Sequence, residues 1–183
     1  MSSKLIVISG PSGVGKGSVV KEILAEHSDF VVSVSATTRS PRAGEINGRE
    51  YHFLSEEEFR AGIENGEMLE YAIVHGSNLY GTPKQPVLNQ LAQGHSVILE
   101  IDIQGAQQVK ANYPDAITVF IAPPSMDELA RRLAGRGTET ESEQSIRLVT
   151  AEQEMESRDR FDFVIVNNDV RECAAEVVKL MLR

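Results

Sequence analysis

Residues 10–18 read GPSGVGKGS and directly follow the apolar run LIVI at residues 5–8. A strand followed by a glycine-rich turn, a lysine and a helix is typical of a loop that wraps a chain of phosphates. Glycines permit positive φ, so backbone N–H groups can converge, and the following helix adds its positive dipole end. Lys16 would neutralise the outer phosphates. The pattern predicts a nucleoside triphosphate site formed by Gly10, Pro11, Ser12, Gly13, Val14, Gly15, Lys16, Gly17 and Ser18.

Position 17 departs from the usual phosphate loop. In that loop a Ser or Thr follows the lysine and its hydroxyl reaches Mg²⁺, whereas this chain has Gly17 there and places the hydroxyl on Ser18. Because glycine offers no side-chain ligand, we expect Mg²⁺ to be held by phosphate oxygens, water and carboxylates elsewhere. Ser18 is better placed to contact an inner phosphate. This variant favours phosphoryl transfer between small molecules over a GTPase switch or a motor.

A second group of polar residues lies in the stretch SVSATTRSPRAGEINGREY, residues 33–51. Arg39 and Arg42 are three apart, Pro41 restricts the backbone between them, and Tyr51 follows. Guanidinium groups match phosphate oxygens bidentately, and a phenol can donate a further hydrogen bond. From these residues alone, two interpretations stay open: a clamp for a phosphate monoester, and an ordinary solvated basic loop.

Short apolar runs rich in β-branched residues recur along the chain, at residues 5–8, 97–99, 117–121 and 164–166. Such runs suit strands that are buried on both faces of a parallel sheet. Helical patterns separate these runs, at residues 17–27, 82–94, 125–133 and 170–182. The alternation of strands and helices predicts a doubly wound parallel α/β fold of the P-loop type.

The starts and faces of three helices can also be predicted. Val19, Val20, Ile23 and Leu24 are expected to share the buried face of the first helix. Thr82 precedes a proline and is expected to cap a helix that stops at Gly94, and Ser125 with Glu128 forms a capping box before another helix.

Two segments interrupt the alternation. Residues 33–81 show strand-like alternation, which predicts a small mixed or antiparallel sheet with a turn at 75–78 and a helix capped by Ser55 and Glu58. Residues 135–147 are polar and flanked by arginines, a composition typical of a mobile lid. We therefore predict a single domain, 1–183. It is divided into a core of residues 1–32, 82–125 and 154–183, an inserted region of residues 33–81, and a short lid of residues 126–153.

The composition of the 183 residues fits a globular protein, with 41% hydrophobic and 25% charged residues. A net charge of −9 argues against non-specific binding to nucleic acid or anionic membranes. The single cysteine, Cys173, excludes an intrachain disulfide, and the four apolar residues before the glycine loop are too few for a signal peptide. We expect a cytoplasmic protein that binds neither nucleic acid nor membranes. The sequence specifies no oligomeric state.

Taken together, the motifs resemble the guanylate kinase family over essentially the full length of the chain. The resemblance is carried by GPSGVGKGS, SVSATTRSPRAGEINGREY, MLEY, NLYGTP, LEIDIQG and GRGTETE, which follow one another in the family's order. It implies transfer of the γ-phosphate of ATP to GMP, with Mg²⁺ as the cofactor and ATP and GMP as the small-molecule partners. The four histidines are scattered without metal-ligand spacing, so no zinc site is expected.

The resemblance also assigns roles to residues. Lys16, Arg39, Arg136 and Arg147 would be catalytic, and Arg132 and Asn168 would join the glycine loop in binding ATP. The phosphate of GMP would be held by Arg39, Arg42, Tyr51 and Tyr80. Its base would contact Ser35, Glu70 and Thr82, with Glu100 and Asp102 nearby.

The chemistry of guanine supports the role of Glu70. Guanine presents a ring N–H and an exocyclic amine side by side, and one carboxylate can accept from both. Adenine has an acceptor at the ring position, which would face the carboxylate unfavourably. Without the surrounding motif, Glu70 would be interpreted as an ordinary exposed strand residue.

Glu100 and Asp102 are two apart where an apolar strand ends, so they are expected to point the same way. The end of such a strand is a usual place for a carboxylate that holds metal-bound water. The family carries aspartate where Glu100 stands. The sequence therefore leaves open which of the two faces Mg²⁺ and which faces guanine.

Two other functions are compatible with parts of this pattern. A sugar-phosphate kinase of the same fold would share the glycine loop but would not need Glu70 as a base reader. A non-catalytic phosphopeptide-binding module would keep the arginines of residues 33–51 but would have little use for Lys16 and Arg136.

Overall fold

The computed structural model describes residues 3–74, 78–134 and 141–182. Its centre is a five-stranded sheet in which every neighbouring pair of strands is parallel. The strand order is β2-β7-β1-β8-β9. The strands are β1 (Leu5–Ser9), β2 (Phe30–Val32), β7 (Ser96–Glu100), β8 (Ile117–Ala122) and β9 (Phe163–Val166).

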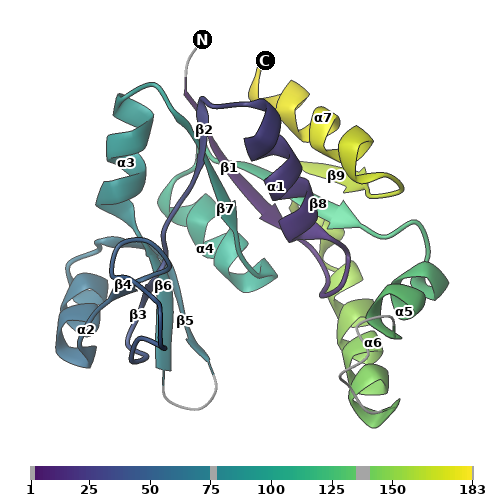
Figure 1. Ribbon diagram of the computed structural model, residues 1–183, viewed down its shortest axis with the longest axis horizontal. Coiled ribbons are helices and arrows are strands. Elements are labelled where there is room, and N and C mark those ends of the chain that lie inside the picture. Colours follow the sequence, from purple (N-terminus) through teal and green to yellow (C-terminus); the bar gives the residue numbers. More distant parts are fainter. Residues whose placement is uncertain (1–2, 75–77, 135–140, 183) are drawn as a thin grey trace.

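Helices cover both faces of this sheet (Figure 1). They are α1 (Lys16–Glu26), α3 (Lys84–Ala92), α4 (Ile103–Asn112), α5 (Met126–Ala134), α6 (Glu141–Met155) and α7 (Val170–Met181), with a short 3₁₀ turn η1 (Arg158–Arg160) before β9. Alternate residues of β1 enter opposite layers. Ile6 and Ile8 pack in one cluster with α1, α5 and α7, whereas Leu5 and Val7 pack in another with α3 and α4.

A second, smaller sheet follows β2 in the chain, with the order β4-β3-β6-β5. It consists of β3 (Ala36–Thr37), β4 (His52–Phe53), β5 (Met68–Val74) and β6 (Asn78–Pro83), and it carries the helix α2 (Glu56–Glu64). The β3–β4 pair is parallel, while the other two pairs are antiparallel. Its core is built around Phe59, which is completely buried. The prediction of a doubly wound parallel sheet with an inserted mixed sheet is thus confirmed.

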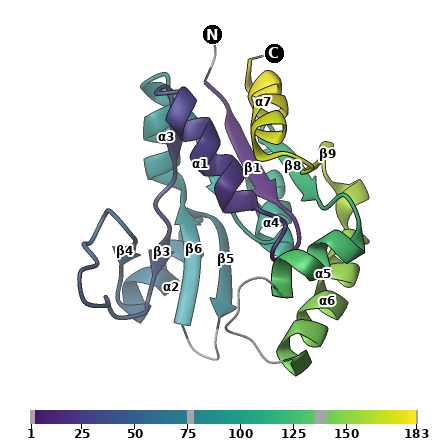
Figure 2. The same ribbon diagram turned by 45° about the vertical axis from the view of Figure 1, so that its right-hand side comes forward.

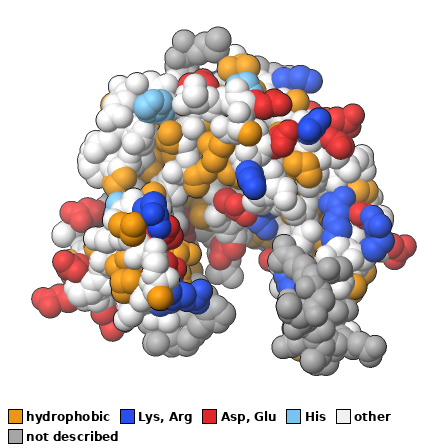
Figure 3. Space-filling model, in the orientation of Figure 1, with side chains coloured by type: hydrophobic (Ala, Val, Ile, Leu, Met, Phe, Trp, Pro, Cys, Tyr) orange, Lys and Arg blue, Asp and Glu red, His pale blue; other side chains and the backbone are white. Residues whose placement is uncertain are grey.

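The two regions inserted into the core lie on opposite sides of the sheet's carboxyl edge. In both ribbon views the second sheet stands on one side, and α5 and α6 stand on the other (Figures 1 and 2). Because β1, β7 and β8 are parallel, the segments that follow them begin at this same edge. The surface is hollowed here in the space-filling view, and acidic and basic side chains are interspersed over that face (Figure 3).

Several local predictions need correction. Ser55 and Glu58 do form the capping box of α2. Thr82, however, caps no helix: it belongs to β6, and Pro83 precedes α3. Ser125 accepts the Glu128 N–H as predicted, but the Glu128 carboxylate binds Arg131 and Arg132. Leu24, predicted to be buried, is 37% exposed, since the apolar face of α1 is completed by Val19, Val20 and Ile23.

The predicted turn at 75–78 and the centre of the predicted lid, 135–140, lie outside the described residues, apart from Asn78 at the start of β6. The helices on either side of 135–140 are described. Leu129 and Leu133 of α5 and Ala151 of α6 are buried in the larger core cluster. Part of the segment 126–153 is therefore packed against the sheet.

Candidate active site

The glycine loop between β1 and α1 lies directly against β8. Gly10, with φ of 141°, has so little room that a Cβ would fall 2.2 Å from the Ile121 carbonyl oxygen. Gly15, with φ of 97°, precedes α1, and a Cβ there would fall 2.7 Å from Asn167 Nδ2. A side chain is excluded at Gly10 by the backbone of β8 and hindered at Gly15 by the Asn167 amide, and both glycines have the positive φ that other residues rarely adopt. The loop is therefore held in one conformation by close packing.

Lys16 starts α1 and folds back over the loop. Its Nζ donates to the Gly10 carbonyl at 2.6 Å and to the Pro11 carbonyl at 3.1 Å. A pocket of about 510 Å³ opens beside it, and Lys21 and Glu100 also line this pocket, with Ser12, Gly13, Gly15, Lys16, Gly17 and Ser18. The concavity combines loop backbone, a helix N-terminus and lysine side chains. These groups supply the N–H donors and positive charge that bind phosphates.

Two side chains brace the loop from below. Asn167, 2% exposed, donates from Nδ2 to the Val14 carbonyl at 2.8 Å. Arg132 donates to the same carbonyl at 3.3 Å, to the Asn167 carbonyl at 3.1 Å and to Glu128 Oε1 at 2.8 Å. Asn167 was not predicted from sequence, and Arg132 was predicted only as a residue that binds ATP. In this structure both side chains hold the glycine loop in place through the Val14 carbonyl.

The second cluster of basic and aromatic residues forms on the small sheet. The two terminal nitrogens of Arg39 donate to the two carboxylate oxygens of Glu45, each at 3.0 Å, and the guanidinium lies 5.4 Å from the centre of the Tyr51 ring. The Tyr51 ring meets the Tyr80 ring edge-on at 5.9 Å. The Arg39 guanidinium holds the pKa of Glu45 below its usual range. The structure thus brings Arg39, Tyr51 and Tyr80 together, and Arg42 lies exposed in the adjoining loop.

Glu70 is a buried carboxylate, 7% exposed, on β5. The antiparallel register places it opposite Thr82, whose hydroxyl donates to Glu70 Oε1 at 2.6 Å. Burial is the main cause that raises the pKa of Glu70, and the nearby charge of Asp102 adds to it, while the Thr82 hydrogen bond opposes it. This contact explains why Thr82 does not cap α3.

The space around Glu70 is kept open by Gly105 of α4. A Cβ on Gly105 would lie 3.0 Å from Glu70 Oε2, and the Gly105 N–H donates to Asp102 Oδ1 at 2.7 Å. Asp102 therefore caps α4 and faces Glu70 from the other side of this glycine. Ser35 is half-buried next to β3, and its carbonyl accepts the His52 N–H.

The prediction that Glu100 and Asp102 point the same way is wrong. Glu100 is the last residue of β7, after which the chain turns, so that Asp102 is already the N-cap of α4. Glu100 lines the glycine-loop pocket, where its carboxylate would lie 3.5 Å from a Cβ on Gly17. The alternation of a strand ends with the strand, and the two carboxylates consequently serve different pockets.

The predicted lid arginines are described only in part. Arg136 lies outside the described residues. Arg147, on α6, donates to the Ser12 hydroxyl of the glycine loop. Arg131, by contrast, is exposed on the surface of α5 and paired with Glu128. Asn168 is exposed, next to the buried Asn167.

Other candidate groups have structural roles. Cys173 is buried, which raises the pKa of its thiol to about 12. Within the described ranges, no three His, Cys, Asp or Glu side chains gather as a metal site. Among those residues, too, no helix is long and apolar enough to cross a membrane.

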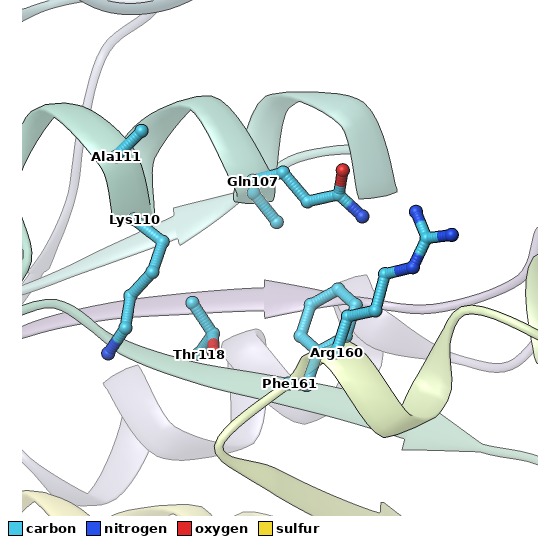
Figure 4. Close-up of a pocket in the computed structure, with 7 residues that line it drawn as sticks. Gln107, Lys110, Ala111, Thr118, Arg160 and Phe161 are labelled. Atoms are coloured by element: carbon cyan, nitrogen blue, oxygen red, sulfur yellow. The ribbon is translucent and has the colours of Figure 1, made fainter.

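A further pocket, of about 310 Å³, lies between α4, β8 and η1 (Figure 4). Lys110 points along one of its walls, but its Nζ is bound to Asp162 at 2.9 Å and to the Ala116 carbonyl at 2.8 Å. Asp162 also accepts hydrogen bonds from the backbone and hydroxyl of Thr118. This network joins α4 to β8, so Lys110 is engaged in packing the core.

Comparison with known proteins agrees with this geometry. A family model described as guanylate kinase matches residues 2–183. A guanylate kinase of Synechocystis sp. is 46% identical over 181 residues, which are 99% of this chain and 94% of that protein. The chain belongs to the guanylate kinase family.

Two further guanylate kinases show how close the likeness is. One from Dechloromonas aromatica is 52% identical over 170 residues, which are 93% of this chain and 84% of that protein. The crystal structure of guanylate kinase from Anaplasma phagocytophilum superposes with a TM-score of 0.73 at 34% identity, and it covers 99% of this chain and 85% of that chain. The family resemblance predicted from the motifs is confirmed.

Within this guanylate kinase fold, we expect Asn167→Ala to lower kcat/KM for ATP about fivefold. The Val14 carbonyl would lose one of its two donors, which costs about 1 kcal/mol, and the loop would gain room beneath Gly15. Steady-state kinetics of Asn167→Ala beside Asn65→Ala, which alters an exposed asparagine at the end of α2, would provide the comparison. Equal kinetics of the two variants would contradict the bracing role of Asn167.

Proposed function

We propose that this chain transfers the γ-phosphate of ATP to GMP, forming ADP and GDP. The observation that carries the proposal is the buried Glu70 carboxylate, which is paired with Thr82 and lies beside Asp102 at the same edge as the glycine loop. Among the described residues no cationic side chain is paired with Glu70, and a buried carboxylate in this setting suits a ligand that brings its own pair of N–H donors. Guanine is such a ligand.

In this proposal, Glu70 and Asp102 read guanine, with Ser35 and Thr82 as the remaining base contacts. Thr82 keeps one Glu70 oxygen oriented, and Gly105 leaves room for the base to approach the other. The phosphate of GMP is held by Arg39, Arg42, Tyr51 and Tyr80. Because Glu45 and the aromatic rings already orient Arg39, little side-chain entropy is lost on binding.

The donor phosphates occupy the glycine loop, from Gly10 to Ser18, with Lys16 as the catalytic cation. Arg132, Arg136 and Arg147 would complete the neutralisation of the phosphates, and Asn168 would belong to the loop beside adenine. The accepting phosphate oxygen of GMP is already ionised at neutral pH, so no side chain has to remove a proton from it. Catalysis is then alignment and charge neutralisation.

The donor set at the loop fits Mg²⁺ bound mainly through the nucleotide. Glu100 faces the loop across Gly17, and carboxylate and hydroxyl oxygens are suitable ligands for this ion or its water molecules. Glu100 would hold the ion or its water molecules, Ser18 would contact an inner phosphate, and Asp102 would remain with guanine. The bound ion would supply neutralisation of charge on the transferred phosphoryl group.

We also propose that residues 33–81 and the lid, 126–153, close over the core of residues 1–32, 82–125 and 154–183 within one domain. The acidic net charge supports partners limited to small nucleotides, without nucleic acid or membranes. The reduced, buried Cys173 and the substrates support a cytoplasmic location.

An ADP-release assay with ATP and a panel of acceptors tests the proposal. GMP should be phosphorylated far more efficiently than AMP, UMP or ribose phosphates. Preference for a ribose phosphate would support the sugar-phosphate kinase instead. If no acceptor released ADP while phosphopeptides bound, the chain would be a binding module.

Lowering the pH should weaken GMP binding through Glu70. The carboxyl must be ionised to accept both guanine donors, and its pKa is raised, mainly by burial. As the pH falls, the free enzyme therefore takes up this proton at a higher pH than an ordinary glutamate would, and GMP must displace it. KM for GMP should rise on acidification, and more steeply than in Glu70→Gln.

Comparison with Glu70→Gln is needed because the phosphate of GMP also titrates. Calorimetry in buffers of different ionisation enthalpy would count the protons released on GMP binding. Equal proton release by the two proteins would contradict a titrating Glu70 at the base.

A further inference from the structure

The helix α6 contacts the glycine loop through two residues of one face. Arg147 and Glu154 are seven apart, which is two helical turns, so both side chains project from the same side. Arg147 donates to the Ser12 hydroxyl, and the Glu154 carboxylate lies near enough to the Ser12 backbone N–H for that N–H to lower its pKa. Ser12 is exposed at the tip of the loop, so these contacts fix a residue that the core does not hold.

The Glu154 carboxylate is only partly satisfied. Its Oε2 is buried and has no hydrogen-bond partner in the described part of the chain. Burial raises the pKa of Glu154, while the Ser12 N–H and the charge of Lys16 oppose that shift and Asp102 adds to it. A buried acceptor without a donor destabilises the folded protein, because its lost hydration is not replaced. The unpaired Oε2 does not help to hold α6 against the glycine loop, so a purely structural role would not explain it.

The position of this oxygen relates it to the reaction. Glu154 lines a pocket of about 470 Å³ between β5, α4 and α6, with Asp102 and Gln107 on its opposite wall. In Figure 2, α6 lies beside α5, on the side of the molecule opposite the second sheet. Glu154 therefore shares a pocket with Asp102, at the guanine end, and is within electrostatic reach of Lys16, at the donor phosphates.

We propose that Glu154 is a positioning residue for the donor nucleotide. Its carboxylate faces the Ser12 N–H, on the helix face from which Arg147 contacts the Ser12 hydroxyl. The buried Oε2 is kept for a hydrogen-bond donor that becomes available when the nucleotide binds. This inference rests on the proposed kinase function. The unpaired oxygen destabilises the enzyme without nucleotide, and the hydrogen bond formed in the nucleotide complex offsets that destabilisation, as at other strained functional sites.

Glu154→Gln separates positioning from bracing, because glutamine keeps the shape and one acceptor for Ser12 but replaces the second oxygen with an amide donor. We expect kcat/KM for ATP to fall about tenfold or more, with the affinity for GMP within about twofold of the unaltered chain. The melting temperature of the free enzyme should be equal or higher, since a buried unpaired carboxylate is removed. Glu154→Ala should lose at least as much kcat/KM.

The matched control is Glu152→Gln, which changes an exposed carboxylate on the same helix and should leave kinetics and melting temperature unaltered. Unaltered kcat/KM for ATP in Glu154→Gln would overturn the proposal. So would a lower melting temperature accompanied by weaker GMP binding, because that result describes a structural brace. Activity of the unaltered chain on ATP and GMP is measured first, so failure of the proposed function is recognised separately.

Discussion

Replacing Lys16 with alanine should lower kcat about 10²–10³-fold, the usual cost of removing one preorganised charge from a transition state. Lys16 is the first residue of α1, and this position would place its ammonium group at the donor phosphates. In the free protein it is held within the loop by the Gly10 and Pro11 carbonyls. The loop itself does not depend on Lys16, since packing on Ile121 and the hydrogen bond from Asn167 remain. The loss should therefore appear in kcat rather than in folding.

The measurement is steady-state kinetics together with circular dichroism and GMP titration of the same variant. Circular dichroism and GMP affinity should match those of the unaltered chain. Lys179→Ala removes an exposed lysine from α7, far along the chain from the loop, and serves as the control. Near-normal turnover by Lys16→Ala would rule out the glycine-loop mechanism.

The features that sequence predicted well are those specified locally. The glycine loop is a contiguous motif, and its glycines have the positive φ values that the pattern requires. The β-branched runs became the buried strands β1, β7 and β8. The edge strand β9 was also predicted, although Val164 and Val166 are half-exposed. β2 was missed because it has three residues, too few for a periodic pattern to be recognised.

Predictions failed where a distant residue competes with a local signal. Thr82 precedes a proline as a helix cap would, but the pairing of β5 with β6 places it opposite Glu70. Its hydroxyl therefore donates to Glu70, twelve residues away. Glu100 and Asp102 have the spacing of one strand face, but β7 ends between them. In each case the tertiary contact, which no local window contains, decides the side chain's direction.

Asn167 and Glu154 were missed for a different reason. Asn167 stands beside Asn168, and only burial under the glycine loop separates their roles. Glu154 is one of several glutamates on α6, and its distinction is a buried oxygen near Ser12, a residue far earlier in the chain. The seven-residue spacing from Arg147 is the one sequence signal that could have pointed to it. The roles of the remaining site residues stay predictions.

The second large effect is expected from Glu70→Gln, which should lower kcat/KM for GMP about 10–100-fold. Thr82 already donates to Glu70 Oε1, so the glutamine would keep its carbonyl oxygen toward Thr82 and direct its amide toward the base. That amide is a donor facing a guanine N–H. One buried guanine donor would be left unpaired, at a cost of about 1–3 kcal/mol.

The same change should narrow the preference for GMP over AMP, since adenine would now meet a donor instead of a repelling carboxylate. KM for ATP should not move, because Glu70 lies on the second sheet and the glycine loop on the core. Glu67→Gln, an exposed glutamate just before β5, is the matched control. Unchanged GMP kinetics in Glu70→Gln would mean that Glu70 is not the base reader. The buried carboxylate would then need another partner, and the sugar-phosphate kinase would become the better explanation of the fold.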